Sequence, residues 1–190
     1  MLLSNREIAF VGLMMAFSVL LVTLGGYIES STLFFLAAAS FLTGVIERNF
    51  SLLPSALFLV GSSLLSLILA PQKVYVATFA FFGIYILVAE YFEKKLFLQE
   101  KPSPLPVEWV TKAIVYHILF LSAVFLTKEF LGFDALNKNK LFTTIWEKKA
   151  LFILVAIAAA EALWLVFDRA YVFFQRRYGR FFLVNRDHGQ

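Results

Sequence analysis

The stretch ALFILVAIAAAEALWLVFDRAYVFF, residues Ala150–Phe174, is the clearest guide to the fold of this chain. It is apolar almost throughout, and the only charged residue in its first half is Glu161. A transmembrane helix needs about 20 consecutive, mostly apolar residues. Ala150–Phe174 is long enough, so it predicts a membrane-spanning helix that carries a carboxyl group near its middle.

The composition of the whole chain agrees with this prediction. Of the 190 residues, 61% are hydrophobic and 16% are charged, and the mean hydropathy is +0.80. Soluble domains contain about 45–50% apolar and about 25% charged residues, so we expect an integral membrane protein. The absence of cysteine excludes disulfides, thiol nucleophiles and cysteine-bound metals. In a membrane protein the net charge of +4 reports loop orientation and does not indicate nucleic-acid binding.

Six apolar segments predict a single domain, residues 1–190, folded as an all-α bundle of six transmembrane helices. They cover about residues 8–24, 32–46, 51–70, 74–92, 109–127 and 150–174. The second segment is shorter than the roughly 17 residues at the lower limit for a span. The first continues past Leu20 without a small-residue cleavage site, so we expect a retained span and not a secretory signal.

The positions of lysine and arginine predict the orientation, because cytoplasmic loops carry more of them. With the N-terminus inside, 11 basic residues fall on the inner side: Arg6, Arg48, Lys94, Lys95, Lys101, Lys112, Arg169, Arg176, Arg177, Arg180 and Arg186. The outer side then holds 6: Lys73, Lys128, Lys138, Lys140, Lys148 and Lys149. We therefore expect a multi-pass protein of a bacterial or archaeal plasma membrane with both termini in the cytoplasm.

Glu161 and His117 are predicted to lie near the middle of the bilayer. Glu161 is 12 residues from Lys149, and His117 is nine residues from Glu108, which places them roughly 18 and 13 Å along their helices. Ionisable groups at this depth are costly and usually face a polar cavity or a partner. Either the two residues line a ligand or ion site, or Glu161 is protonated or bonded to His117 or a hydroxyl and holds two helices together.

Trp164 and Asp168 follow Glu161 at i+3 and i+7 and therefore share its helix face. This places Trp164 among the candidate substrate-binding residues. Asp168 is expected near the inner interface, in a salt bridge with a basic residue such as Lys112, Arg169 or Arg176.

Small residues mark one face of the first segment. Gly12 and Ala16 form a small-xxx-small pair, and Ala9 flanks it. Such residues let two helices approach closely in a membrane. The face either packs inside the bundle or docks another membrane subunit.

Aromatic and polar residues gather at the predicted outer ends of the spans: Tyr27, Glu29, Tyr75 and Trp146. Aromatic residues at these positions often anchor a protein in the membrane interface. The alternative is that they line the mouth of a binding site.

The motifs of several enzyme classes are missing. The sequence contains no Walker A motif, GxGxxG, HExxH or acidic metal cluster, and Gly61-Ser62-Ser63 lacks the glycine that follows the nucleophile of intramembrane serine proteases. We therefore expect a protein that is not an enzyme and has no cofactor or metal.

The layout resembles the substrate-binding S component of energy-coupling factor (ECF) transporters. The similarity lies in six short spans within 190 residues, the charged start NREIAF, and the small residues of the first segment. It implies capture of a small water-soluble, vitamin-like nutrient, with uptake driven by a membrane coupling subunit and cytoplasmic ATPases. The family's A-x-x-x-A docking motif corresponds to Gly12 and Ala16, with glycine in place of the first alanine. By position, the resemblance implies that the outer pocket of the family corresponds to Tyr27–Ser31, Gln72–Tyr75 and Trp146.

A non-transport scaffold, similar in plan to the cell-shape membrane protein MreD, is the alternative. The arginine-rich tail QRRYGRFFLVNR, Gln175–Arg186, and the basic segment Glu93–Glu108 would then bind other membrane proteins.

Overall fold

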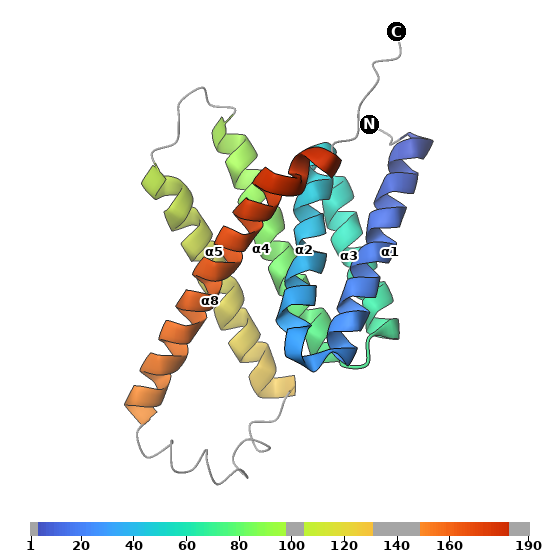
Figure 1. Cartoon of the computed structure of the whole chain (residues 1–190). Coiled ribbons are helices and arrows are strands. Elements are labelled where there is room, and N and C mark those ends of the chain that lie inside the picture. The colour runs from blue at the N-terminus through green and yellow to red at the C-terminus, as the bar shows by residue number, and fades with distance from the viewer. Residues whose placement is uncertain (1–3, 98–104, 131–148, 183–190) are drawn as a thin grey trace.

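The computed structural model describes residues 4–97, 105–130 and 149–182 (Figure 1). Within these ranges the chain forms helices and no strand, which confirms the predicted all-α fold. The elements are α1 (Asn5–Tyr27), η1 (Glu29–Ser31), α2 (Thr32–Asn49), α3 (Leu52–Leu69), α4 (Lys73–Phe97), α5 (Leu105–Phe130), α8 (Lys149–Tyr178) and η2 (Gly179–Phe182). By length and composition, three of the described helices, α1, α3 and α4, are able to cross a membrane.

The helices match the apolar segments closely. Five of the predicted segments lie inside a helix, and α3 is one residue shorter than its segment at each end. The short segment 32–46 forms the 18-residue helix α2, because the helix continues through Glu47, Arg48 and Asn49.

Local contacts define the ends of the first two helices. Ser4 and Glu7 form a capping box in which each side chain accepts a hydrogen bond from the backbone N–H of the other residue. At the other end of α1, the hydroxyl of Thr32 donates a hydrogen bond to the Gly25 carbonyl at 2.7 Å. A Cβ atom at Gly26 would lie 2.5 Å from Cγ of Pro71, so the glycine lets α1 end against the α3–α4 turn.

Helix α2 lies in the centre of the bundle. It contacts α1, α3, α4 and α8, and all residues from Ala39 to Glu47 are buried. Small side chains on α2 allow these close approaches. A Cβ atom at Gly44 would lie 1.9 Å from the hydroxyl oxygen of Tyr171, so α8 crosses α2 where α2 has no side chain.

Helix α8 crosses the bundle obliquely (Figure 1). Its last turns and η2 lie beside the end of α2, whereas its first turns lie away from α1 to α3. Helix α5 packs on α4. We call the end of the bundle that holds the start of α1 and the ends of α2 and α8 the terminal end, and the end that holds the α3–α4 turn the opposite end.

Candidate functional site

An apolar cavity of about 330 Å³ lies between α4, α5 and α8. Each helix contributes one face to it, with residues spaced three or four apart. The lining residues are Thr78, Phe81, Phe82 and Tyr85 from α4, Tyr116, Leu119 and Phe120 from α5, and Ala160, Leu163, Trp164 and Phe167 from α8. Because Thr78 follows the start of α4 closely and Tyr85 lies near its middle, the cavity occupies the half of the bundle toward the opposite end.

Stacked aromatic rings form the walls of this cavity. Phe82 and Phe167 are stacked with ring centroids 4.3 Å apart. Tyr116 stacks on Trp164 at 5.2 Å, with an angle of 15° between the ring planes. Their flat, apolar surfaces suit a molecule that contains a ring. Stacked aromatic rings gain free energy beyond that expected from the area they bury.

The polar atoms of the cavity wall bond to one another. Trp164 Nε1 donates to the hydroxyl of Tyr85 at 3.0 Å, and this hydroxyl donates to Asp168 Oδ1, also at 3.0 Å. Lys112 Nζ lies 3.4 Å from the same carboxylate oxygen. All four residues are buried. The chain of bonds holds the Trp164 ring in place, since every group in it has a partner.

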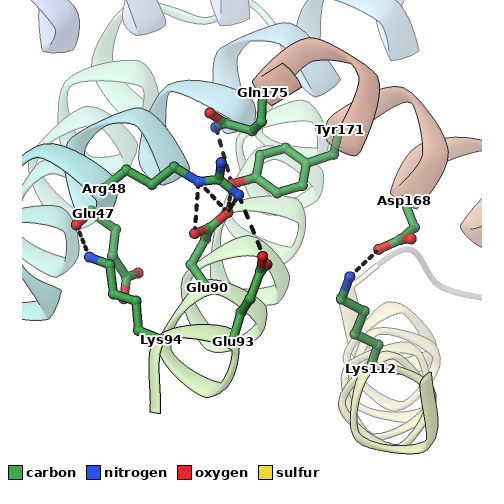
Figure 2. A network of polar contacts seen from close by, with 9 residues as sticks. All are labelled: Glu47, Arg48, Glu90, Glu93, Lys94, Lys112, Asp168, Tyr171 and Gln175. Atoms are coloured by element: carbon green, nitrogen blue, oxygen red, sulfur yellow. Dashed lines mark hydrogen bonds and ion pairs between the residues drawn. The ribbon is translucent and has the colours of Figure 1, made fainter. Parts of the chain in front are cut away.

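A second polar network lies at the terminal end, where α2, α4 and α8 meet (Figure 2). Arg48 donates hydrogen bonds to both carboxylate oxygens of Glu90, and its guanidinium lies 3.9 Å from Glu93. The Tyr171 hydroxyl donates to Glu90 Oε1 at 2.5 Å, and Gln175 donates to Tyr171 at 3.1 Å. This network ties one end of three helices together.

The network has a neighbouring contact that also joins α2 to α4. Lys94, in the last turns of α4, donates a hydrogen bond to the backbone carbonyl of Glu47 (Figure 2). Its ammonium group therefore binds a carbonyl at the end of α2, where the last carbonyls of a helix have no partner within the helix.

Among the residues singled out from the sequence, Trp164 lines the cavity. His117 and Glu161 lie side by side, with Nε2 and Oε1 2.9 Å apart, but neither belongs to the cavity lining. Their side chains are 53% and 36% exposed, respectively, on the outer surface of α5 and α8. The structure thus brings the pair together as the depth argument predicted, and the contact joins two helices outside the cavity.

The salt bridge predicted for Asp168 is confirmed. Its partner is Lys112 of α5. Arg169 instead lies over the ring of Trp109, with Cζ 4.8 Å from the ring centroid, in the geometry of a cation–π contact.

Two candidate residues of the outer mouth, Tyr27 and Tyr75, do not line the cavity. Tyr27 is exposed at the end of α1, and Tyr75 packs against a separate cluster around Val22 and Phe79. Glu29 begins η1, but its side chain is outside the described part, as is the whole of Trp146.

The small residues of α1 lie on a face that the described helices leave open. Ala9, Gly12 and Ala16 are exposed, and a Cβ atom added at Gly12 would have no neighbour within 4 Å. Leu13 and Phe17, on the same helix, are also exposed. This face therefore takes no part in packing among the described helices.

Two features of the site were missed in the sequence. Glu90 is a carboxylate inside the predicted segment 74–92, and the reasoning applied to Glu161 would have found it. The aromatic lining gave no such signal, because Phe82 and Phe167 are ordinary residues in a chain with 23 phenylalanines.

No protein-family model, curated protein or solved structure matches this chain.

Proposed function

We propose that this protein is a membrane-embedded binding subunit that captures a small molecule in the aromatic cavity. The observation that carries this proposal is the cavity itself, which is partly open, is lined by one face each of α4, α5 and α8, and is walled by stacked rings. Cavities of this size with mostly apolar linings and a few oriented polar groups are the usual form of a ligand site.

In the proposed membrane placement, the cavity lies in the outer half of the membrane. We take all six helices as spans with the terminal end in the cytoplasm, because of the excess of basic residues on that side. The cavity lies in the half of the bundle toward the opposite end. A ligand from outside would therefore reach the rings of Tyr116 and Trp164 without crossing the whole membrane.

The chemistry of the wall favours the uncharged, ring-bearing part of a nutrient. The indole N–H of Trp164 and the hydroxyl of Tyr85 already have partners, and the hydroxyl of Tyr116 donates to the carbonyl of Ala160 at 2.8 Å. A charged group in the cavity would meet no free counter-charge among the lining residues. A vitamin-like molecule with a planar ring, as expected from the resemblance to S components, fits this wall.

The open face of α1 is the proposed docking surface for a membrane coupling subunit. The exposed residues Ala9, Gly12 and Ala16 would let a partner helix approach closely, and cytoplasmic ATPases bound to that partner would drive uptake. Gly12→Leu should stop co-purification of the partner, because a branched side chain holds two helix backbones apart. Normal co-purification of this variant would rule out the face as the docking surface.

Native mass spectrometry of the protein purified from its own membranes tests the ligand. The wild type should release a small molecule of defined mass. Ala160→Phe fills the cavity and should lose that molecule, whereas Ala158→Phe, on an exposed face of the same helix, should keep it. Equal retention by both variants, or the absence of any ligand in the wild type, would refute the binding proposal.

Native mass spectrometry also distinguishes the proposed binding subunit from the scaffold alternative. The open α1 face fits a scaffold as well as a transporter subunit. A scaffold would co-purify with partner proteins while its cavity held no small molecule.

A further inference from the structure

A basic hollow lies at the end of α8, away from the aromatic cavity. Its volume is about 760 Å³, and Arg176, Arg177, Tyr178 and Phe181 line it. Both arginines are exposed. In the part of the chain that the structure describes, neither guanidinium forms a salt bridge. Among the described residues, no carboxylate pairs with these two positive charges of the hollow.

The outer wall of the hollow is held in place by the end of α2. Asn49 Nδ2 donates a hydrogen bond to the carbonyl of Phe182 in η2 at 2.9 Å. The ring of Phe182 also lies 6.2 Å from that of Phe174 in α8. These contacts hold η2 against the ends of α2 and α8 (Figure 1), and Phe181 precedes Phe182 in η2.

The length of α8 places the hollow at the membrane surface, given the proposed membrane placement. Thirty residues make a helix of about 45 Å, whereas the hydrocarbon core is only about 30 Å thick. Because α8 crosses the bundle obliquely, much of this length is used to span the core, and its basic last turn, with Arg176 and Arg177, then falls in the headgroup layer. Tyr178 is exposed and Phe181 is 82% exposed, as is typical of aromatic side chains that insert at this level.

We propose that this hollow binds the headgroup of an anionic phospholipid of the cytoplasmic leaflet. Arginine matches phosphate oxygens with parallel N–H donors, and basic pockets on the cytoplasmic side of membrane proteins bind such headgroups. A lipid fits better than free phosphate because its glycerol and acyl parts would cover the exposed ring of Phe181. Inorganic phosphate would satisfy the arginines alone.

Native mass spectrometry after exchange into equimolar phosphatidylglycerol and phosphatidylcholine tests the proposal. The wild type should retain phosphatidylglycerol preferentially. Arg176→Gln together with Arg177→Gln should lower this preference by about 30-fold, because each charge contributes about a fivefold effect. Arg6→Gln removes an exposed arginine elsewhere at the terminal end and should leave the preference unchanged. An equal preference in the wild type and the double variant would overturn the proposal.

Two further arms separate a lipid from a free anion. Phe181→Ser keeps both charges and should still weaken phosphatidylglycerol retention. Millimolar inorganic phosphate should not displace the bound lipid. Full retention by Phe181→Ser, or complete displacement by phosphate, would show a simple anion site and overturn the lipid proposal. This readout is independent of the cavity ligand, so the loss of one proposal leaves the other standing.

Discussion

Arg48 of α2 and Glu90 of α4 form a two-pronged ion pair, with Arg48 Nε 2.8 and 2.9 Å from the two carboxylate oxygens and a terminal guanidinium nitrogen 2.5 Å from Oε1. The pair is asymmetric: the side chain of Arg48 is 36% exposed and that of Glu90 only 3%. Glu90 is thus a buried carboxylate, and a partly exposed arginine balances its negative charge. Tyr171 adds α8 to the contact, so one carboxylate connects three helices.

Removing Arg48 should destabilise the protein more than its exposure suggests. Arg48→Leu leaves Glu90 buried with the Tyr171 hydroxyl as its hydrogen-bond donor, and loss of one member of a buried pair costs about 3 kcal/mol. The double variant Arg48→Leu/Glu90→Leu should lose less than the sum of the two single variants. Unfolding in detergent micelles with increasing denaturant measures this. Arg176→Leu removes an exposed arginine and is the control; it should change stability by less than about 0.5 kcal/mol. If the loss in the double variant equalled the sum of the two single losses, the pair would not be coupled.

Tyr85→Phe should weaken the wall of the cavity. The variant keeps the ring but leaves Trp164 Nε1 without its acceptor and removes a donor from Asp168. An unsatisfied buried polar group costs about 1–3 kcal/mol, so the thermal unfolding midpoint should fall and ligand retention should decline. Tyr178→Phe, at an exposed position, is the matched control. Unchanged stability in Tyr85→Phe would mean that the hydrogen-bond chain does not hold Trp164.

Two glycines should respond in opposite ways to the same substitution. Gly44→Ala places a Cβ atom 1.9 Å from the Tyr171 hydroxyl, and such overpacking costs about 1–3 kcal/mol. Gly12→Ala meets no atom within 4 Å and should gain up to about 1 kcal/mol from helix propensity. Denaturant unfolding of both variants gives the comparison. Similar stabilities for the two would contradict the close crossing of α2 and α8.

His117 and Glu161 should act as a pair that joins helices. Glu161→Leu and His117→Leu each strand a polar partner in an apolar setting, so each should lower stability. The double variant should recover much of the loss, since a pair replaced by apolar residues is often neutral or stabilising. All three variants should retain the cavity ligand, because neither residue lines the cavity. Loss of the ligand in Glu161→Leu with normal stability would instead make Glu161 a binding residue.

Single cysteines should establish the proposed orientation, since the chain has none of its own. Lys73→Cys, exposed at the opposite end, should react with a membrane-impermeant maleimide in intact cells. Arg6→Cys, exposed at the terminal end, should react only after the membrane is opened. The reverse pattern would invert the topology, and the cavity would then open toward the cytoplasm.

The sequence by itself determined the helices. A helix satisfies its own backbone hydrogen bonds, so an apolar segment between polar turns is enough to predict one. That local rule places the six α-helices of the described part, including Lys149–Tyr178. Distance along a helix is also local information. It put His117 and Glu161 at one depth, and the observed 2.9 Å contact agrees with that depth.

Only the tertiary structure decided which helix faces meet. The cavity exists because α4, α5 and α8 turn one face each toward a common space, and a hydropathy pattern does not contain the rotation or crossing of a helix. Arg48 and Glu90 are 42 residues apart, and the local sequence around either residue does not predict that they form a pair. The crossing of α8 over Gly44 brings Tyr171 to that pair. The physical reason is that helix packing depends on the shapes of side chains from several segments at once, whereas helix formation depends on one segment at a time.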